Sequence, residues 1–315
     1  MILQSMSVLA ISLLLIALFS ERVIRYVLVL SKVFGLSEMA AGFILLSITT
    51  SLPELSVSIV AAIIGEGGLS VGNLLGSNVA NLTIILGLAI LLSKTELLVK
   101  GQSQKELVQF LFLSSVIPLF IVQRGSLGPI LGIVLLVLFI YFSVTISRKT
   151  GKTEPLERIK TVDTAKIWLK FLVSVVLIIV LSKLVVDSST EIAEFIELPP
   201  AIIGATIIGL GTSLPELATT IQALKKKLFG MALGNLLGSC VTNITLILGV
   251  SSLISFSQVN VVAVESIMFY VLISSLSIWY IIGASERLGK KVALFLCLVY
   301  ILFILQQIGV SVIIF

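Results

Sequence analysis

The chain carries the sequence Thr-Ser-Leu-Pro-Glu twice, at residues 50–54 and again at residues 212–216. Each copy lies inside a long apolar stretch and places a carboxylate directly after a helix-breaking proline. A carboxylate near the middle of a bilayer costs about 2.5–3.5 kcal/mol on insertion scales. A chain that retains two of them is most easily explained by a bound cation, so we expect Glu54 and Glu216 to be cation ligands.

The proline of each motif should open the backbone beside the glutamate. Pro53 has no backbone N–H and clashes with the carbonyl one turn earlier, so carbonyl oxygens near Thr50 should lose their helical partners. In lipid, such groups must be satisfied by protein, water or an ion. Thr50 and Ser51 add hydroxyl oxygens, and Thr212 and Ser213 repeat the arrangement in the second copy.

A second motif, Gly-Asn-Leu-Leu-Gly-Ser, occurs at residues 72–77 and 234–239. Ser77 and Asn81 are four residues apart on one helix face, as are Ser239 and Asn243. Each of these features taken alone is more often structural, because buried Ser, Thr and Asn usually bond to backbone or neighbours. Their conjunction favours an ion site. The candidate ligands are Glu54, Glu216, Thr50, Thr212, Ser51, Ser213, Ser77, Ser239, Asn81, Asn243 and Ser47.

These ligands are hard oxygen atoms, which suit Ca²⁺ or Na⁺ and disfavour zinc, copper or iron. The sequence has no His, which removes the commonest transition-metal ligand and the usual proton relay near neutral pH. Cys240 and Cys297 both lie in apolar stretches and indicate no disulfide framework.

The elements that must position these ligands are membrane-spanning helices. Hydrophobic residues make up 58% of the chain and charged residues 12%, with a mean hydropathy of +1.21, whereas soluble domains carry roughly 25% charged residues. The chain can hold about ten helices of roughly 20 apolar residues. The expected spans are residues 3–20, 37–63, 68–93, 107–122, 127–147, 165–186, 198–223, 229–256, 260–282 and 290–314. We interpret the first as a span and not as a cleaved signal peptide.

The net charge of +5 reflects topology, so we expect no nucleic-acid partner. When the 21 Lys and Arg residues are assigned to loops, only Arg124 and Lys183 fall on one side of the membrane. The positive-inside rule then predicts a multi-pass protein of the cell membrane with both termini outside and the 148–164 loop in the cytoplasm.

The two motifs belong to a longer internal repeat. Subtracting 50 from 212 gives an offset of 162 residues, which aligns both motifs without a gap. The turn after the first glutamate motif, at residues 65–68, carries no positive charge, whereas the turn after the second motif contains three lysines at 225–227. This difference predicts that the second copy is inverted, as five spans per copy require, and inverted repeats place ion sites near the midplane.

We therefore predict an all-α polytopic membrane protein with about ten transmembrane helices, arranged as two inverted five-helix repeats with helices 2 and 7 interrupted. The predicted units are a first repeat at residues 1–147, a cytoplasmic linker at 148–164 and a second repeat at 165–315.

The doubled motifs resemble those of the cation/calcium exchanger superfamily, and most closely those of prokaryotic sodium/calcium exchangers. This resemblance covers nearly the whole chain and implies an antiporter that moves Ca²⁺ outward against Na⁺ by alternating access. It implies Glu54 and Glu216 as shared Ca²⁺ ligands, with backbone oxygens of Thr50 and Thr212. It further implies that the first and sixth spans slide across the remaining core.

The resemblance also assigns the remaining polar residues. Ser51, Ser77, Ser213 and Ser239 would contribute to flanking Na⁺ sites, and Asn81 and Asn243 would line the centre.

Three positions depart from the family pattern. Asn243 stands where many members carry Asp, so the site has two formal negative charges. Thr49 stands where its copy Gly211 keeps the usual glycine, and Ser47 stands where its copy Gly209 has no side chain. The first half should therefore have an extra hydroxyl ligand and a stiffer break.

The driving ion and the broader class stay open at this point. One Ca²⁺, two Na⁺ or two protons would neutralise two carboxylates, so a proton/calcium exchanger of the same superfamily is an alternative. A cation channel is an alternative of another class, although it would not need matched inverted sites. We expect no enzymatic activity, because an intramembrane protease would need paired Asp, Ser with His, or a metal motif. Ca²⁺ and Na⁺ are expected as substrates and not as cofactors, in a lipid bilayer, with a functional monomer.

Overall fold

The computed structural model describes residues 2–34, 47–92, 97–98, 102–149, 164–225, 229–255, 257–285 and 287–313. Several predicted features lie outside these residues: the start of the second span at 37–46, most of the 148–164 linker, and Lys226 and Lys227.

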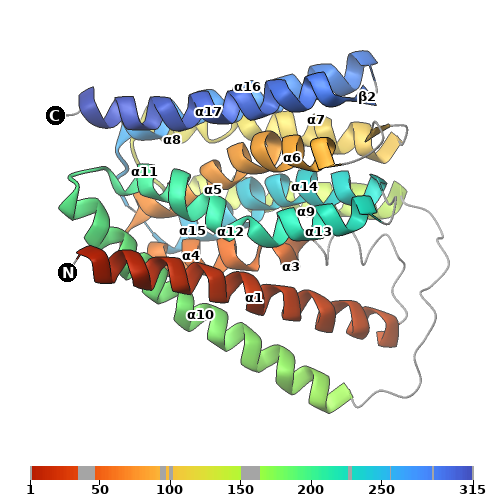
Figure 1. Cartoon of the computed structure of the whole chain (residues 1–315), viewed down its shortest axis with the longest axis horizontal. Helices are drawn as coiled ribbons and strands as arrows, with labels where there is room; N and C mark the ends of the chain where they lie inside the picture. Colours follow the sequence, from red (N-terminus) through yellow and green to blue (C-terminus); the bar gives the residue numbers. More distant parts are fainter. Residues whose placement is uncertain are drawn as a thin grey trace.

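The described residues are helical, apart from turns and two short strands (Figure 1). The helices are α1 (Ile2–Phe34), α3 (Ser47–Thr50), α4 (Leu52–Ile63), α5 (Gly67–Ala80), α6 (Leu86–Leu92), α7 (Gln102–Val116), α8 (Leu119–Arg124), α9 (Pro129–Lys149), α10 (Thr164–Phe195), α11 (Pro200–Ile203), α12 (Gly209–Thr212), α13 (Leu214–Lys225), α14 (Phe229–Thr242), α15 (Leu248–Ile254), α16 (Val261–Ser285) and α17 (Lys290–Ile313). Three π-helical segments, η2 (Asn81–Ile85), η3 (Gly204–Ile208) and η4 (Asn243–Ile247), are continuous with neighbouring α-helices, and the strands are β1 (Leu97–Leu98) and β2 (Arg287–Leu288).

The predicted helical membrane architecture is confirmed at this level, because the described residues include 7 helical stretches that are long and apolar enough to cross a bilayer. They are Ile2–Val23, Gly67–Leu92, Thr164–Phe195, Pro200–Ile221, Ala232–Ile254, Val261–Ala284 and Lys290–Gly309. Many large apolar side chains on these helices are exposed, including Leu3 at 75% and Tyr280 at 67%, as expected for surfaces that face lipid.

The candidate span Ile2–Val23 agrees with the predicted first span to within three residues, and α1 continues as a helix to Phe34. The charged residues that suggested an end are accommodated within the helix. Arg25 lies 3.8 Å from Glu21 one turn earlier, and the guanidinium of Arg22 lies over the ring of Phe19. Such pairs one turn apart support a helix beyond the apolar region.

The helix bounds repeat with the same offset as the sequence. Adding 162 to the bounds of α5, η2 and α6 gives those of α14, η4 and α15 residue for residue, and α3 and α4 correspond in the same way to α12 and α13. The predicted interruptions are present at both motifs, where Ser51 (φ −82°, ψ 13°) and Ser213 (φ −82°, ψ 6°) separate the paired helices. The π-helical segments were not predicted.

Helices α1 and α10 lie side by side and run in opposite directions (Figure 1). Ser5, near the start of α1, donates a 2.6 Å hydrogen bond to Glu191, near the end of α10. The two helices share a hydrophobic cluster with parts of α4, α5, α11 and η3 that is separate from the main core. They therefore form a unit that borders the interrupted helices.

The interrupted segment α11–η3 packs closely on α5, because glycines line the contact. A Cβ added at Gly72 would overlap the carbonyl oxygen of Ala201, and one added at Gly76 would overlap that of Ala205. From the other side, a Cβ at Gly204 would lie 2.6 Å from the carbonyl oxygen of Leu69. Backbones approach this closely only where small residues leave room.

Backbone pairings join loops at both ends of α16. Beyond its end, β2 pairs with β1 in the antiparallel register Leu97↔Leu288. Before its start, Ser126 and Gln258 form an isolated antiparallel bridge. Under the 162-residue offset, the Leu97–Leu288 pair corresponds to Val259 and Ser126, which is within one residue of the observed bridge.

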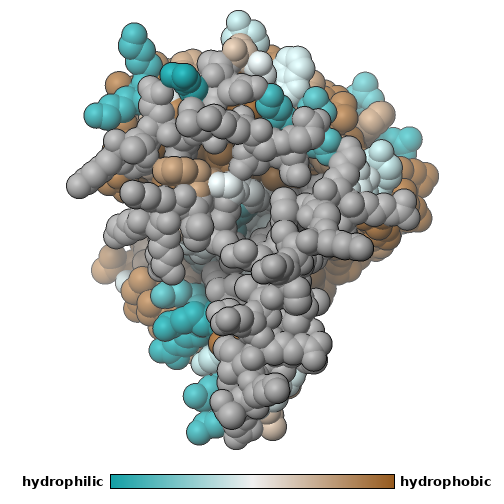
Figure 2. Space-filling model, turned by 90° about the vertical axis from the view of Figure 1, so that its right-hand side faces the viewer, coloured by the Kyte–Doolittle hydropathy of each residue, from teal (hydrophilic) through white to brown (hydrophobic). Residues whose placement is uncertain are grey.

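Hydrophilic residues gather around the end of the molecule where α9 finishes and α10 begins, whereas hydrophobic residues cover its flanks (Figure 2). The exposed basic residues described near the helix starts at this end are Lys166, Lys170, Arg287, Lys290 and Lys291. This distribution agrees with the charge asymmetry of the sequence.

Candidate cation site

The two motif glutamates lie in one buried network, and each is bonded to the motif serine of the other half. Ser213 Oγ donates to Glu54 Oε1 at 3.0 Å, and Ser51 Oγ donates to Glu216 Oε1 at 3.3 Å. The two bonds are equivalent under the 162-residue offset. The breaks at Ser51 and Ser213 therefore bring both carboxylates into a shared site between the halves.

A second ring of hydrogen bonds also crosses between the halves in equivalent pairs. These bonds join Thr50 to Asn235 and Ser239, and Thr212 to Asn73 and Ser77, with oxygen–oxygen distances between 3.1 and 3.3 Å. Eight of the eleven predicted ligands take part in these crossed hydrogen bonds. They are Glu54, Glu216, Thr50, Thr212, Ser51, Ser213, Ser77 and Ser239.

The site keeps oxygen atoms without hydrogen-bond partners even though it is fully enclosed by protein. Both glutamates are 0% exposed. Their Oε2 atoms, both side-chain polar atoms of Asn81 and the Oδ1 of Asn243 have no partner among the described residues. Buried polar atoms are nearly always satisfied, so such a cluster suggests atoms that serve a ligand. In the described part of the chain, no Lys or Arg forms an ion pair with either glutamate.

Asn81 and Asn243 lie at the first positions of η2 and η4. The η2 segment contacts α13, which carries Glu216, and η4 contacts α4, which carries Glu54. Asn243 Nδ2 donates to Asn78 Oδ1 at 3.1 Å, and Asn78 Nδ2 donates to the carbonyl oxygen of Cys240 at 3.0 Å. Asn81 and Asn243, which were predicted to line the centre, are therefore adjacent to the helices that carry the glutamates. Asn243 is held by Asn78, which was not among the predicted ligands.

Sequence reasoning did not place Asn73, Asn235 and Asn78 in this network. Asn73 and Asn235 stand in the duplicated Gly-Asn-Leu-Leu-Gly-Ser motif, so their constant offset of 162 residues was the available signal. Asn78 has no copy, because residue 240 is Cys, so the repeat gave no signal for it.

The halves differ in how these asparagines are supported. Asn73 Nδ2 donates to Ser58 Oγ at 2.9 Å and to the carbonyl oxygen of Glu54 at 3.3 Å. At the equivalent positions, Asn235 Nδ2 and Thr220 Oγ1 have no partner among the described residues. The first half therefore holds its asparagine more firmly than the second.

Ser47 and Thr49, the two positions of the first half that depart from the family pattern, are both buried, at 1% and 5% exposure. The Ser47 carbonyl oxygen accepts from Thr50 Oγ1 at 3.3 Å. Its copy, the carbonyl oxygen of Gly209, accepts from Ser77 Oγ at 3.0 Å. Ser47 thus borders the network through its backbone, and whether its hydroxyl ligates an ion stays a prediction.

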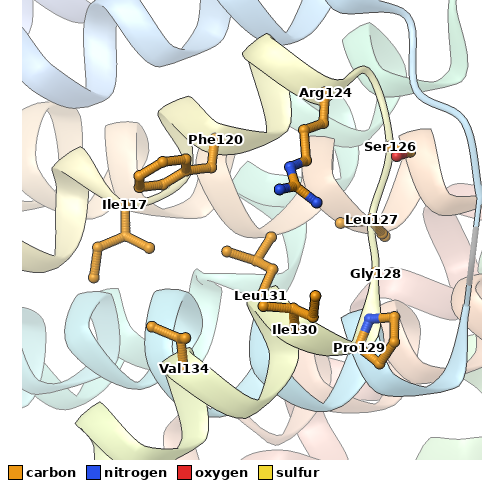
Figure 3. Close-up of a pocket in the computed structure, with 10 residues that line it drawn as sticks. All are labelled: Ile117, Phe120, Arg124, Ser126, Leu127, Gly128, Pro129, Ile130, Leu131 and Val134. Atoms are coloured by element: carbon orange, nitrogen blue, oxygen red, sulfur yellow. The ribbon is translucent and has the colours of Figure 1, made fainter.

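An apolar groove of about 510 Å³ lies between α8 and α9, away from the glutamates (Figure 3). Its lining includes Ile117, Phe120, Leu131 and Val134, with Arg124 at one end. A guanidinium repels cations, and the lining supplies few oxygen ligands. This groove is therefore not a second cation site.

A family model described as sodium/calcium exchanger protein matches this chain over residues 4–148 and again over residues 166–309. The chain belongs to the sodium/calcium exchanger family. The recognition made from the doubled motifs is therefore confirmed, and the two matches begin 162 residues apart, as the repeat does.

Relatives of this exchanger-family chain include proteins of similar length. The inner membrane protein YrbG of Escherichia coli is 32% identical over 82% of each chain. The sodium/calcium exchanger MaX1 of Methanosarcina acetivorans is 30% identical over 74% of this chain and 78% of its own length. A solved structure of the sodium-calcium exchanger NCX_Mj, soaked with Na⁺ and Ca²⁺, is 26% identical with a TM-score of 0.65, covering 96% of this chain and 98% of that one.

Proposed function

We propose that the chain is a secondary active antiporter that exchanges Ca²⁺ for Na⁺ by alternating access at the site between Glu54 and Glu216. The observation that carries this proposal is the crossed network, in which two buried carboxylates from different halves each keep one oxygen without a partner. The surrounding hydroxyl and amide groups supply further oxygen ligands, which hard cations prefer. The relatives named sodium/calcium exchangers favour Na⁺ as the counter-ion.

The charge of the site couples movement to ion occupancy. Two ionised carboxylates without a cation would be costly in a buried site. One Ca²⁺ or two Na⁺ would neutralise them, so the two ions compete for the same charges. A conformational switch that is favourable only with the charges neutralised produces exchange and not a leak.

We further propose that the eleven predicted residues divide into overlapping sites. Glu54 and Glu216 hold Ca²⁺ with backbone oxygens of Thr50 and Thr212. The flanking Na⁺ sites and the centre are completed by Ser51, Ser77, Ser213, Ser239, Asn81, Asn243 and Ser47. The α1–α10 unit slides over the interrupted helices, which is supported by the extensive packing of α1 on α10.

The proposed topology has ten spans in two inverted repeats, at 1–147 and 165–315, joined by a cytoplasmic linker at 148–164. The matching helix bounds and the opposite directions of α1 and α10 support it (Figure 1). The basic residues at one end support a cell-membrane protein with both termini outside. Because the crossed bonds complete the site within one chain, we propose a functional monomer.

Purified protein in liposomes tests the driving ion. Vesicles loaded with Na⁺ and diluted into Na⁺-free buffer containing Ca²⁺ are expected to accumulate Ca²⁺. This uptake should stop when monensin collapses the Na⁺ gradient. Uptake that ignores Na⁺ but follows a pH gradient would identify a proton/calcium exchanger. Uptake without any counter-ion gradient, accompanied by current, would identify a channel.

A further inference from the structure

Asn78 is the site-adjacent amide that breaks the internal repeat. Its neighbours Ser77 and Asn81 have copies at Ser239 and Asn243, whereas its own equivalent position holds Cys240. Asn78 is 0% exposed and both ends of its amide are hydrogen-bonded. It is therefore a buried polar group that one half has and the other lacks.

The hydrogen bonds of Asn78 determine how Asn243 is oriented. The carbonyl oxygen of Cys240 can only accept, so Asn78 must direct Nδ2 toward it, at 3.0 Å. Asn78 Oδ1 then faces Asn243 and can also only accept, so Asn243 must donate through Nδ2, at 3.1 Å. The Oδ1 of Asn243 consequently lies on the opposite side of its amide, buried and without a partner among the described residues.

The amide of Asn81 has no comparable restraint. Neither its Oδ1 nor its Nδ2 has a hydrogen-bond partner in the described part of the chain. The side chain at the position equivalent to Asn78 is a thiol, which is a weak donor and a weak acceptor. The distinction matters beside a cation, because an amide oxygen ligates it whereas an amide NH₂ repels it.

We propose that Asn78 is a positioning residue that fixes the amide of Asn243 so that its oxygen, and not its nitrogen, is available to the transported cation. This inference rests on the proposed function of the site. The η4 segment that begins at Asn243 contacts α4, which carries Glu54. Fixing the amide keeps the whole population competent for binding, whereas a freely flipping amide binds only through the competent fraction.

Asn78→Cys, which copies the residue of the other half, is expected to raise the half-saturating Na⁺ concentration about 2-fold, because a freely flipping amide presents its oxygen to the cation only about half of the time. The maximal rate should change little. The exchange variant N78C/C240N is expected to recover most of the loss, because an asparagine at 240 can hold Asn81 as Asn78 holds Asn243. Na⁺-dependent Ca²⁺ uptake in liposomes measures both effects.

A double-mutant cycle separates positioning from general destabilisation. In the Asn243→Ala background there is no amide to orient, so N78C should no longer change the half-saturating Na⁺ concentration. Thermal melting in detergent checks folding, with Ser115→Ala as a control, since Ser115 is buried and, among the described residues, its hydroxyl bonds to the Leu111 carbonyl oxygen within α7. Equal affinities for N78C and the wild type, or additive effects in the cycle, would overturn the proposal.

If N78C does not fold, Cys240→Asn alone replaces it as the test. In this variant the amides of both Asn81 and Asn243 are fixed, so the half-saturating Na⁺ concentration is expected to fall. An unchanged or raised value would overturn the positioning role. Wild-type uptake driven by Na⁺ is the separate test of the function itself. An active wild type with an unaffected variant would overturn the role of Asn78 alone.

Discussion

Replacing either buried glutamate by glutamine is expected to reduce Na⁺-driven Ca²⁺ uptake by at least about 100-fold, because Ca²⁺ affinity depends steeply on the number of charged ligands. Glu54→Gln and Glu216→Gln each remove one of the two negative charges at the site. The shape of the side chain is preserved, and a glutamine oxygen can still accept the bond that Ser213 or Ser51 now donates. The loss should therefore be one of binding and not of folding.

The measurement is ⁴⁵Ca²⁺ uptake into Na⁺-loaded liposomes containing equal amounts of each variant. Glu265→Gln is a matched control, because Glu265 is an exposed carboxylate on α16 outside the network. It should transport like the wild type. Near-normal uptake by both E54Q and E216Q would remove these residues from the site.

The second large effect is expected at a glycine where helices α5 and α11 meet. Gly72→Ala should lower the free energy of unfolding by about 1–3 kcal/mol, because overpacking forces neighbouring backbone to move. The added Cβ would overlap the carbonyl oxygen of Ala201, which belongs to backbone and cannot rotate away. Since Asn73 follows directly and bonds to Thr212, exchange should also slow.

Gly283→Ala is the matched control, because Gly283 is an exposed glycine within α16 and no described atom lies within 4 Å of a Cβ placed there. Thermal melting in detergent compares the two variants. A melting temperature that falls equally in both, or in G283A alone, would contradict the close contact between α5 and α11.

The central residues of the site could be predicted from the sequence, because few environments in a membrane accept them. A carboxylate in an apolar span needs a partner, and a proline in a helix frees backbone groups, so Glu54, Glu216 and the two breaks follow directly. Because of the repeat, each residue predicted in the first half has an equivalent in the second. The structure brings these equivalent residues together through the hydrogen bonds from Ser51 to Glu216 and from Ser213 to Glu54.

The π-helical segments could not be predicted in this way, because no residue type specifies them. Of the three described, η2 and η4 begin at Asn81 and Asn243 and are accompanied by hydroxyl bonds from Thr83 and Thr245 to carbonyls one turn earlier, whereas η3 begins at Gly204. Such segments are tolerated where tertiary packing supports them, often at functional sites. The partnership of Asn78 with Asn243 is likewise tertiary, since it depends on where two helices meet.

The strand pairing beyond one end of α16 and the bridge before its other end have a mechanical consequence. Backbone hydrogen bonds there fasten the loop between α6 and α7 to the loop between α16 and α17, and the loop between α8 and α9 to the one between α15 and α16. Loops joined at both ends of a helix bundle resist sliding of its helices past one another. The proposed alternation of access is therefore expected to be made by α1 and α10, which take part in neither pairing.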